Sequence, residues 1–208
     1  MKFKLILLLF CLATAFIATA QSADKKDAVI SKKDSLRLAK FKAKGTYPLI
    51  KGSPFSGVLP VSGITEKPDN NLKYKLVISL TAGTKDPDKI KELNKGLAEI
   101  GRIINLHVAA GVPIENLVVV IVTHGPAILA LLNDESFKKE FKAANPNLAI
   151  IKELESAGAK FIACGQAMQF LEVKNEDLLP TVKIALAAKV ALSTYQLKGY
   201  AFYEIDEE

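Results

Sequence analysis

Apolar runs and apolar residues at helical spacing alternate along the chain from residue 72 onward. Tyr74 to Leu80 is a mostly apolar run that predicts a first strand, and Leu117 to Val122 is an almost purely β-branched run that predicts a second. Between them, acidic caps at Asp86 and Asp88 precede apolar residues that recur three or four positions apart, which predicts one helix from these caps to Val108. A strand as uniformly apolar as the second is typical of a parallel sheet that is covered on both faces.

The same alternation continues to the end of the chain. The remaining predicted elements are helices over 127–132, from 134 onward and over 147–158, a strand ending at Cys164, an apolar segment over 182–187, a helix closed by Gly199 and a last strand over 200–205. Strands that alternate with helices in this way predict an α/β fold, with a parallel sheet and helices on both of its faces.

The first seventy residues have a different character from the rest of the chain. Lys2 and Lys4, an apolar run over 5–17 and the small residues 18–20 are typical of a cleavable signal peptide, so residues 1–20 are predicted to be removed and the mature chain to start near Gln21. Residues 21–70 are a Lys-rich and then Pro/Gly-rich extension, and 71–208 are predicted to form the main domain. The protein is therefore expected to be periplasmic or secreted.

The mildly basic net charge says little about whether the protein binds anionic lipid or nucleic acid. The net charge is +6, and the basic residues gather in the extension over 22–45, where Asp24, Asp27 and Asp34 dilute them. We expect this stretch to be a solvated tail rather than a contact with anionic lipid. Basic residues interleaved with aromatic ones, as in nucleic-acid-binding surfaces, do not occur, so no nucleic-acid partner is expected.

The sequence lacks the motifs of several common types of active or binding site. The sequence has no Cys-x-x-Cys, no phosphate-binding loop and no Gly-x-Gly-x-x-Gly, so we expect no dithiol centre and no nucleotide cofactor. Removal of the signal peptide would take away Cys11 and leave Cys164 as one free thiol. Two histidines and one cysteine do not make a structural zinc site, so no metal is expected.

Cys164 is the first candidate for chemistry because it stands where a predicted strand meets a predicted helix. In open α/β sheets ligands bind at this junction. Backbone N–H groups and the helix dipole there favour an anion, and a thiolate is an anion as well as a nucleophile. The alternative is that Cys164 is a small buried core residue, since free cysteines are among the most buried residue types.

His124 is the second candidate, because the predicted second strand also ends in polar residues followed by glycine. If the two strands are parallel neighbours, His124 and Cys164 share one cleft, and the histidine can take the proton of the thiol. Gly125 and Gly165 would let a substrate approach the backbone closely, and Gly165 and Gln166 would offer N–H groups to an anion. The alternative for His124 is a packing or helix-capping role.

Four segments of the chain resemble the DsrE/DsrF-like family. They are Val122–Leu132, Gly158–Met168, Glu176–Pro180 and Tyr195–Ala201, and they stand in the order that the family shows. The resemblance implies a three-layer α/β/α domain with a mostly parallel five-stranded sheet, and homo- or hetero-oligomers. Well-studied members are cytoplasmic sulfur carriers, in which one cysteine accepts sulfur as a persulfide and passes it on.

The resemblance assigns expected roles to the two candidates. Cys164 matches the cysteine of many members, and His124 matches the common histidine after the second strand. The first hypothesis is therefore a sulfur-carrier or thiol-transfer protein with a protein donor or acceptor of sulfur, although the predicted export departs from the cytoplasmic pattern. The alternative is a non-catalytic module that binds a small ligand or assembles into a homo-oligomer. The sequence leaves open whether the protein is an enzyme.

Overall fold

The computed structural model describes residues 34–86 and 88–206, so the predicted signal peptide lies outside the described residues. The chain divides into two compact units, residues 1–43 and 44–208. The described part of the first unit is helical, and this helix continues to residue 44. In the described residues, no helix has the length and apolar character needed to cross a membrane.

The second unit is built on a five-stranded sheet in which all neighbouring strands are parallel, in the order β4-β3-β2-β1-β5. The strands are β1 (Tyr74–Leu80), β2 (Leu117–Thr123), β3 (Lys160–Cys164), β4 (Lys183–Ala185) and β5 (Ala201–Ile205). The predicted α/β class and the five-stranded parallel sheet are confirmed, and the first strand has the predicted bounds.

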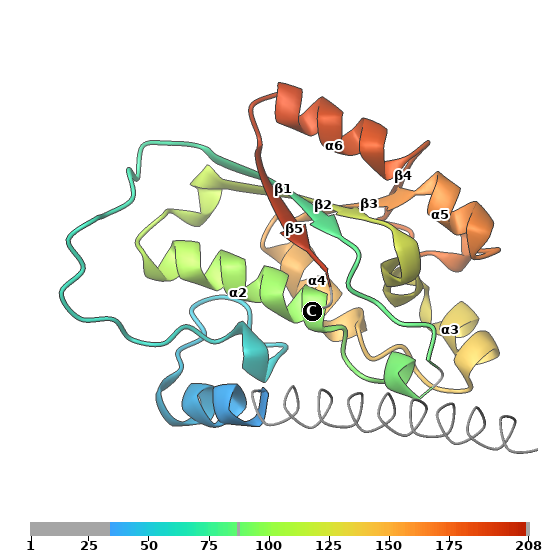
Figure 1. The fold of residues 1–208 in the computed structure, drawn as a ribbon, viewed down its shortest axis with the longest axis horizontal. Coiled ribbons are helices and arrows are strands. Elements are labelled where there is room, and N and C mark those ends of the chain that lie inside the picture. The colour runs from blue at the N-terminus through green and yellow to red at the C-terminus, as the bar shows by residue number, and fades with distance from the viewer. Residues whose placement is uncertain (1–33, 87, 207–208) are drawn as a thin grey trace, which may run out of the picture. The chain divides into compact units, whose positions relative to one another are not determined.

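Helices lie on both faces of the sheet, as expected, but the two faces are unequal (Figure 1). The α-helices are α2 (Lys95–Ala109), α3 (Asp134–Phe141), α4 (Leu148–Ser156), α5 (Gly165–Phe170) and α6 (Ala188–Leu197). The 3₁₀ helices are η1 (Pro54–Ser56), η2 (Lys89–Lys91), η3 (Ile114–Asn116), η4 (Gly125–Leu131) and η5 (Asn175–Asp177). α2 and α4 share the core of one face, whereas α6 covers the other.

The two faces follow from the alternation of side chains along each strand. Ile78 and Ile121 belong to the large core under α2 and α4, and α2 itself contributes Leu97, Ile100 and Ile104 to it. The opposite face has a much smaller core, in which strand valines meet the alanines of α6. Small residues let α6 approach the sheet closely.

The prediction of one helix from the acidic caps to Val108 is wrong at its start. The chain forms the short helix η2, breaks at Glu92, whose backbone is extended, and begins α2 at Lys95. Asn94 is the N-cap of α2, because its side chain accepts the N–H of Leu97. Its amide also donates to the carbonyl of Ala82, just after β1, which ties the helix start to the sheet edge.

A buried chain of asparagines extends this tie to the other helices. The side chain of Asn147 accepts the N–H of Asn94, and Asn147 in turn donates to the side chain of Asn145. Asn145 donates to the carbonyls of Ala130 and Leu132, which follow β2. The loops at the carboxyl edge of the sheet are therefore fixed to one another by satisfied polar groups.

The Pro/Gly-rich segment before β1 is fastened to α2 by two buried side chains, Asn105 and Ser56, and the Ser56 hydroxyl donates to the carbonyl of Ala98 (2.9 Å). The Oδ1 of Asn105 accepts the N–H groups of Leu49 (3.0 Å) and Ile50 (2.9 Å), and its Nδ2 donates to the carbonyls of Ile50 (2.7 Å) and Ser56 (2.8 Å). Gly101 on the same helix lets the segment lie close, because a Cβ there would stand 2.7 Å from Ser56 Oγ. This part of the predicted extension thus packs as a layer on the main domain.

The last helix carries the chain back across the sheet to β5, on the face opposite to the other helices. The helices after β1, β2 and β3 contribute to the large core, including Met168 of α5. The helix after β4, α6, contributes Ala188 and Ala191 to the small core on the opposite face. β3 and β4 are therefore neighbouring strands whose helices leave to opposite faces of the sheet.

We predict that Asn105→Ala lowers the free energy of unfolding by about 2–4 kcal/mol, because three buried hydrogen bonds to the backbone and a fourth, partly buried one are lost. Urea unfolding of the full chain measures the change. Asn71→Ala, at an exposed position, is the control and should stay within about 0.5 kcal/mol of the parent. Equal stability of the two variants would show that the segment is not held through Asn105.

Candidate functional site

Cys164 lies at the end of β3, on the face of the sheet that α6 covers, as the sequence predicts for a strand–helix junction. Its side chain packs in the small core with Val77, Val120 and Val122 of the neighbouring strands. Only 6% of the residue is exposed. The sulfur is therefore at the rim of the sheet but is largely covered.

The sulfur is held by the helix after β4. Cys164 Sγ accepts the backbone N–H of Ala188, the first residue of α6, with N···S 3.2 Å. The N-cap residue Ala187 has no side chain that could accept this hydrogen, so the sulfur fills the role of the capping acceptor. The sulfur therefore lies at the N-terminal end of α6.

The sequence predicts that the N–H groups of Gly165 and Gln166 are offered to an anion, and for Gln166 the structure shows another partner. The N–H of Gln166 donates to the carbonyl of Leu186 (3.2 Å), so it is not free for an anion, and the Gln166 side chain is exposed. At Gly165 the backbone of β4 approaches closely, because a Cβ there would lie 3.0 Å from Ala185 O, and the predicted approach of a substrate stays a prediction. Both residues therefore serve the packing of β4 and α6 beside the sulfur.

His124 directly follows β2, and its side chain contacts β1. Its Nε2 lies 2.9 Å from Ser79 Oγ. It stands at the N-cap position of η4 but makes no capping hydrogen bond, so the predicted capping alternative does not hold. Burial lowers the pKa of His124 below its ordinary value, and the negative charge of Glu204 partly opposes this shift.

Four polar side chains form a staggered row near the carboxyl edge of the sheet, because Ser79 pairs with Val122, two positions before His124. Thr123 pairs with Ala163, so His124 and Cys164 are the next positions along neighbouring strands. Ser79 pairs with Glu204 on the outer strand β5. The order is thus Cys164, His124, Ser79 and Glu204, on the face of α6. Within residues 34–86 and 88–206, no hydrogen bond joins Cys164 to His124, whose ring is engaged by Ser79.

Gly125 is needed for its backbone conformation. Its φ is +59°, which residues with a side chain rarely adopt, and no atom lies within 4 Å of the place of a Cβ. The positive φ turns the chain from β2 into η4 directly after His124. The predicted approach of a substrate to Gly125 has the open space that it requires, and it stays a prediction.

Sequence reasoning missed Ser79, Ala188 and Glu204. Ser79 carried a signal, because it is a polar residue in the otherwise apolar half of β1. Ala188 carried none, since it acts through its backbone. Glu204 belongs to an acidic end of the chain that is typical of a solvated tail, and only the pairing of β5 with β1 brings it to the row.

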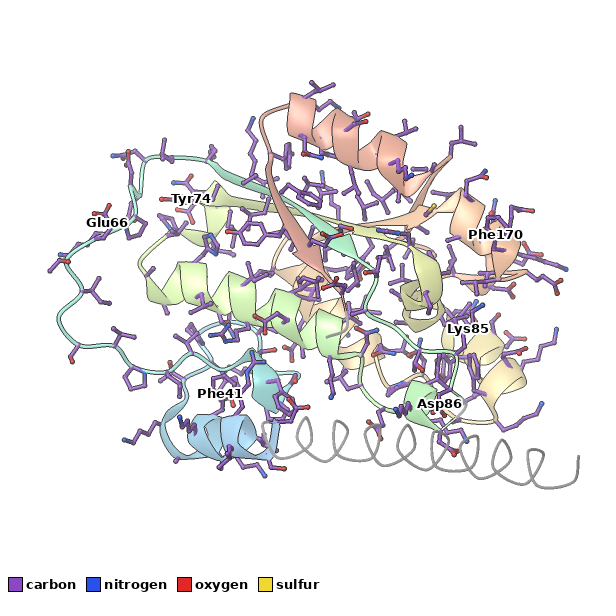
Figure 2. The ribbon with its side chains drawn as sticks, viewed as in Figure 1. Phe41, Glu66, Tyr74, Lys85, Asp86 and Phe170 are labelled. Carbon is purple, nitrogen blue, oxygen red and sulfur yellow. The ribbon has the colours of Figure 1, made fainter. Side chains whose placement is uncertain are left out.

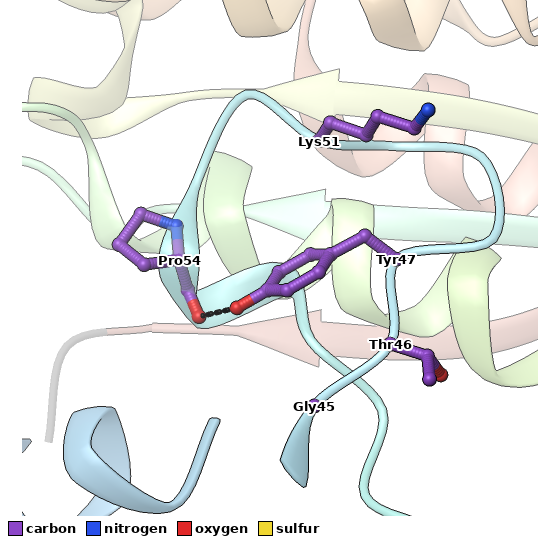
Figure 3. A pocket seen from close by; sticks show the side chains of 5 residues that line it. All are labelled: Gly45, Thr46, Tyr47, Lys51 and Pro54. Carbon is purple, nitrogen blue, oxygen red and sulfur yellow. Dashed lines mark hydrogen bonds between the residues drawn. The ribbon is translucent and has the colours of Figure 1, made fainter. Parts of the chain in front are cut away.

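The row of Cys164, His124, Ser79 and Glu204 forms no metal cluster with other described residues. The surface depression shown in Figure 3 is lined by other residues. Among the described residues, no three His, Cys, Asp or Glu side chains are grouped so that they could hold a metal ion. The depression is open and is lined by Gly45, Thr46, Tyr47, Lys51 and Pro54, with the Tyr47 hydroxyl donating to the Pro54 carbonyl (Figure 3). It belongs to the segment before β1.

Comparison with known proteins decides the family. The model of the DsrE/DsrF-like family matches residues 75–202, which contain all of β2, β3 and β4 and the row residues from Ser79 to Cys164. The chain belongs to the DsrE/DsrF-like family. A search of curated proteins gave no match.

Two solved structures are similar to this family member. One is the protein of unknown function MTH1491 from Methanobacterium thermoautotrophicum, with 16% identity and a TM-score of 0.43 over 62% of this chain and 99% of that one. The other is the ychN protein from E. coli, with 16% identity and a TM-score of 0.44 over 63% of this chain and 98% of that one.

Proposed function

We propose that this DsrE-like protein is a sulfur carrier in which Cys164 is the persulfide site. The observation that carries the proposal is the N–H of Ala188, which points at the sulfur from the N-terminus of α6. This N–H and the helix dipole stabilise the thiolate, and the thiolate is the reactive form of cysteine. Membership of the DsrE/DsrF-like family is consistent with sulfur relay.

The transfer step is an exchange between sulfur atoms without net oxidation. The Cys164 thiolate attacks the outer sulfur of a donor persulfide, R–S–SH. The S–S bond of the donor breaks, a new S–S bond forms on Cys164, and the donor leaves as the thiolate R–S⁻. The proton stays on the transferred sulfur, and the reverse step delivers the sulfur to an acceptor thiolate.

Access to Cys164 limits which donors can react. Because only 6% of the residue is exposed, the sulfur offers little room to a bulky donor. We propose that a slim persulfide group on a partner protein is the donor, and that export by the signal peptide places donor and acceptor outside the cytoplasm.

We predict that the full chain gains one sulfur atom at Cys164 when it is incubated with a low-molecular-weight persulfide. Intact-mass spectrometry measures the gain, and a reductant should remove it. Cys11→Ser, which keeps Cys164, should load like the parent, whereas Cys164→Ser should not load. No gain in the parent, or an equal gain in Cys164→Ser, would rule out the carrier function.

A second candidate function, assembly into a homo-oligomer, is favoured by the exposed apolar side chains around β4 and α6. They are Phe170, Ile184, Leu186, Val190 and Leu197, which are between 44% and 89% exposed. Phe170 projects from α5 into solvent (Figure 2). Exposed apolar groups gathered on neighbouring elements are typical of contact surfaces. We propose that this surface pairs copies of the chain beside the covered sulfur.

We predict that the full chain sediments as an oligomer and that Leu186→Glu shifts it toward the monomer. A charge in an apolar contact costs several kcal/mol, enough to raise the dissociation constant by more than about a hundredfold. Leu72→Glu, at another exposed leucine before β1, is the matched control. A parent that is monomeric at micromolar concentration, or equal effects of the two substitutions, would exclude this surface as the contact.

A further inference from the structure

The hydroxyl of Ser79 has one hydrogen-bond partner in the described residues, and this partner is His124. Ser79 is 2% exposed, and its Oγ lies 2.9 Å from Nε2 of the ring. A buried hydroxyl proton without an acceptor costs free energy, so the hydroxyl is expected to donate to this nitrogen. Nε2 then acts as the acceptor and carries no hydrogen.

This hydrogen bond selects one neutral form of the imidazole. A neutral ring carries one proton, so an accepting Nε2 places that proton on Nδ1. No described residue hydrogen-bonds to Nδ1, and His124 is half-buried at the carboxyl edge of the sheet. The ring therefore offers an N–H group, and not a lone pair, to whatever binds beside it.

The surroundings also disfavour the charged form of the ring. A second proton on the ring would have to sit on Nε2, where it would compete with the hydroxyl proton of Ser79 in a buried place. Burial lowers the pKa of His124, and Glu204 on β5 opposes this shift to a smaller extent. Cys164 on β3 is the other titratable group of the row, and Ser79 on β1 is neutral.

We propose that Ser79 is a positioning residue that fixes His124 as a neutral Nδ1–H donor, and that this donor stabilises the anionic sulfur bound at Cys164. This role differs from the proton acceptor that the sequence suggests, because a base needs a bare nitrogen facing the thiol. The assignment of the anion rests on the proposed carrier function. The tautomer does not depend on it.

The tautomer is measured by long-range ¹H–¹⁵N NMR correlations on the full chain. The sequence has two histidines, and His107 serves as an internal reference because its Nδ1 lies 2.8 Å from the carbonyl of Ile103 and so carries a hydrogen. We expect the same Nδ1–H form for His124, with a pKa below its ordinary value of 6.5. An Nε2–H form in the parent would overturn the proposal.

Variants of Ser79 test whether this residue sets the tautomer. Ser79→Ala removes the hydroxyl, so the Nε2–H form should increase and the pKa of His124 should rise. Ser79→Thr keeps the hydroxyl and should preserve both properties. An unchanged tautomer in Ser79→Ala would assign the selection to another group and overturn the proposal.

The donor role is tested by the rate at which Cys164 takes up sulfur from a low-molecular-weight persulfide. His124→Ala should lower this rate about tenfold, the loss expected for one hydrogen bond to a charged group. His124→Asn, whose amide can donate from a place near Nδ1, should lower it clearly less. Equal losses in the two variants would favour a base and contradict the donor role. No uptake by the parent would refute the carrier function and the assigned anion, while the NMR result would still decide the tautomer.

Discussion

The hydrogen bond from the Ala188 N–H to the sulfur of Cys164 joins the end of β3 to the start of α6, the helix that covers the opposite face of the sheet from the other helices. β3 and β4 are neighbours, yet their helices leave to opposite faces of the sheet. The first N–H groups of a helix need acceptors, and the chain provides no capping side chain at Ala187. The sulfur meets this need, so the same contact completes the N-terminus of α6 and places a hydrogen-bond donor on the proposed persulfide site.

The unequal faces of the sheet explain why the candidate site lies on one side. The face under α2 and α4 is filled by large aliphatic side chains, and asparagine side chains join the loops at its carboxyl edge. The face under α6 is filled by small residues, and polar groups from four strands line its carboxyl edge. Several larger apolar side chains of β4, α6 and the segment between them are exposed, namely Ile184, Leu186, Val190 and Leu197.

Much of the fold could be predicted from local patterns. The apolar runs located the strands, and the end of β3 at Cys164 was found because a buried run stops there before a glycine. The start of α2 was missed because two aspartates imitate a cap, whereas the working cap, Asn94, depends on Ala82 and Asn147 for its position. Such long-range partners leave no periodic signal in the sequence.

The candidate site was only partly predicted, because one of its contacts also depends on a residue that is distant in the sequence. The sequence placed Cys164 and His124 at one edge, and the register of β2 and β3 brings them to adjacent positions. It assigned the anion-stabilising N–H to the helix after Cys164, because sequence neighbours are the visible choice. The group that donates belongs to Ala188, 24 residues later, and it has no side-chain signature.

The most direct test of this account is the reactivity of Cys164 in Ala188→Pro, made in a Cys11→Ser chain. Proline removes the N–H, is favoured at the first position of a helix, and follows a residue that is already extended (Ala187, φ −152°, ψ 148°). At neutral pH, alkylation by iodoacetamide should slow about tenfold, because the thiolate loses a charge-assisted hydrogen bond. Ala188→Gly, which keeps the N–H, should slow far less. Equal rates in the proline and glycine variants would contradict the claim that this N–H activates the sulfur.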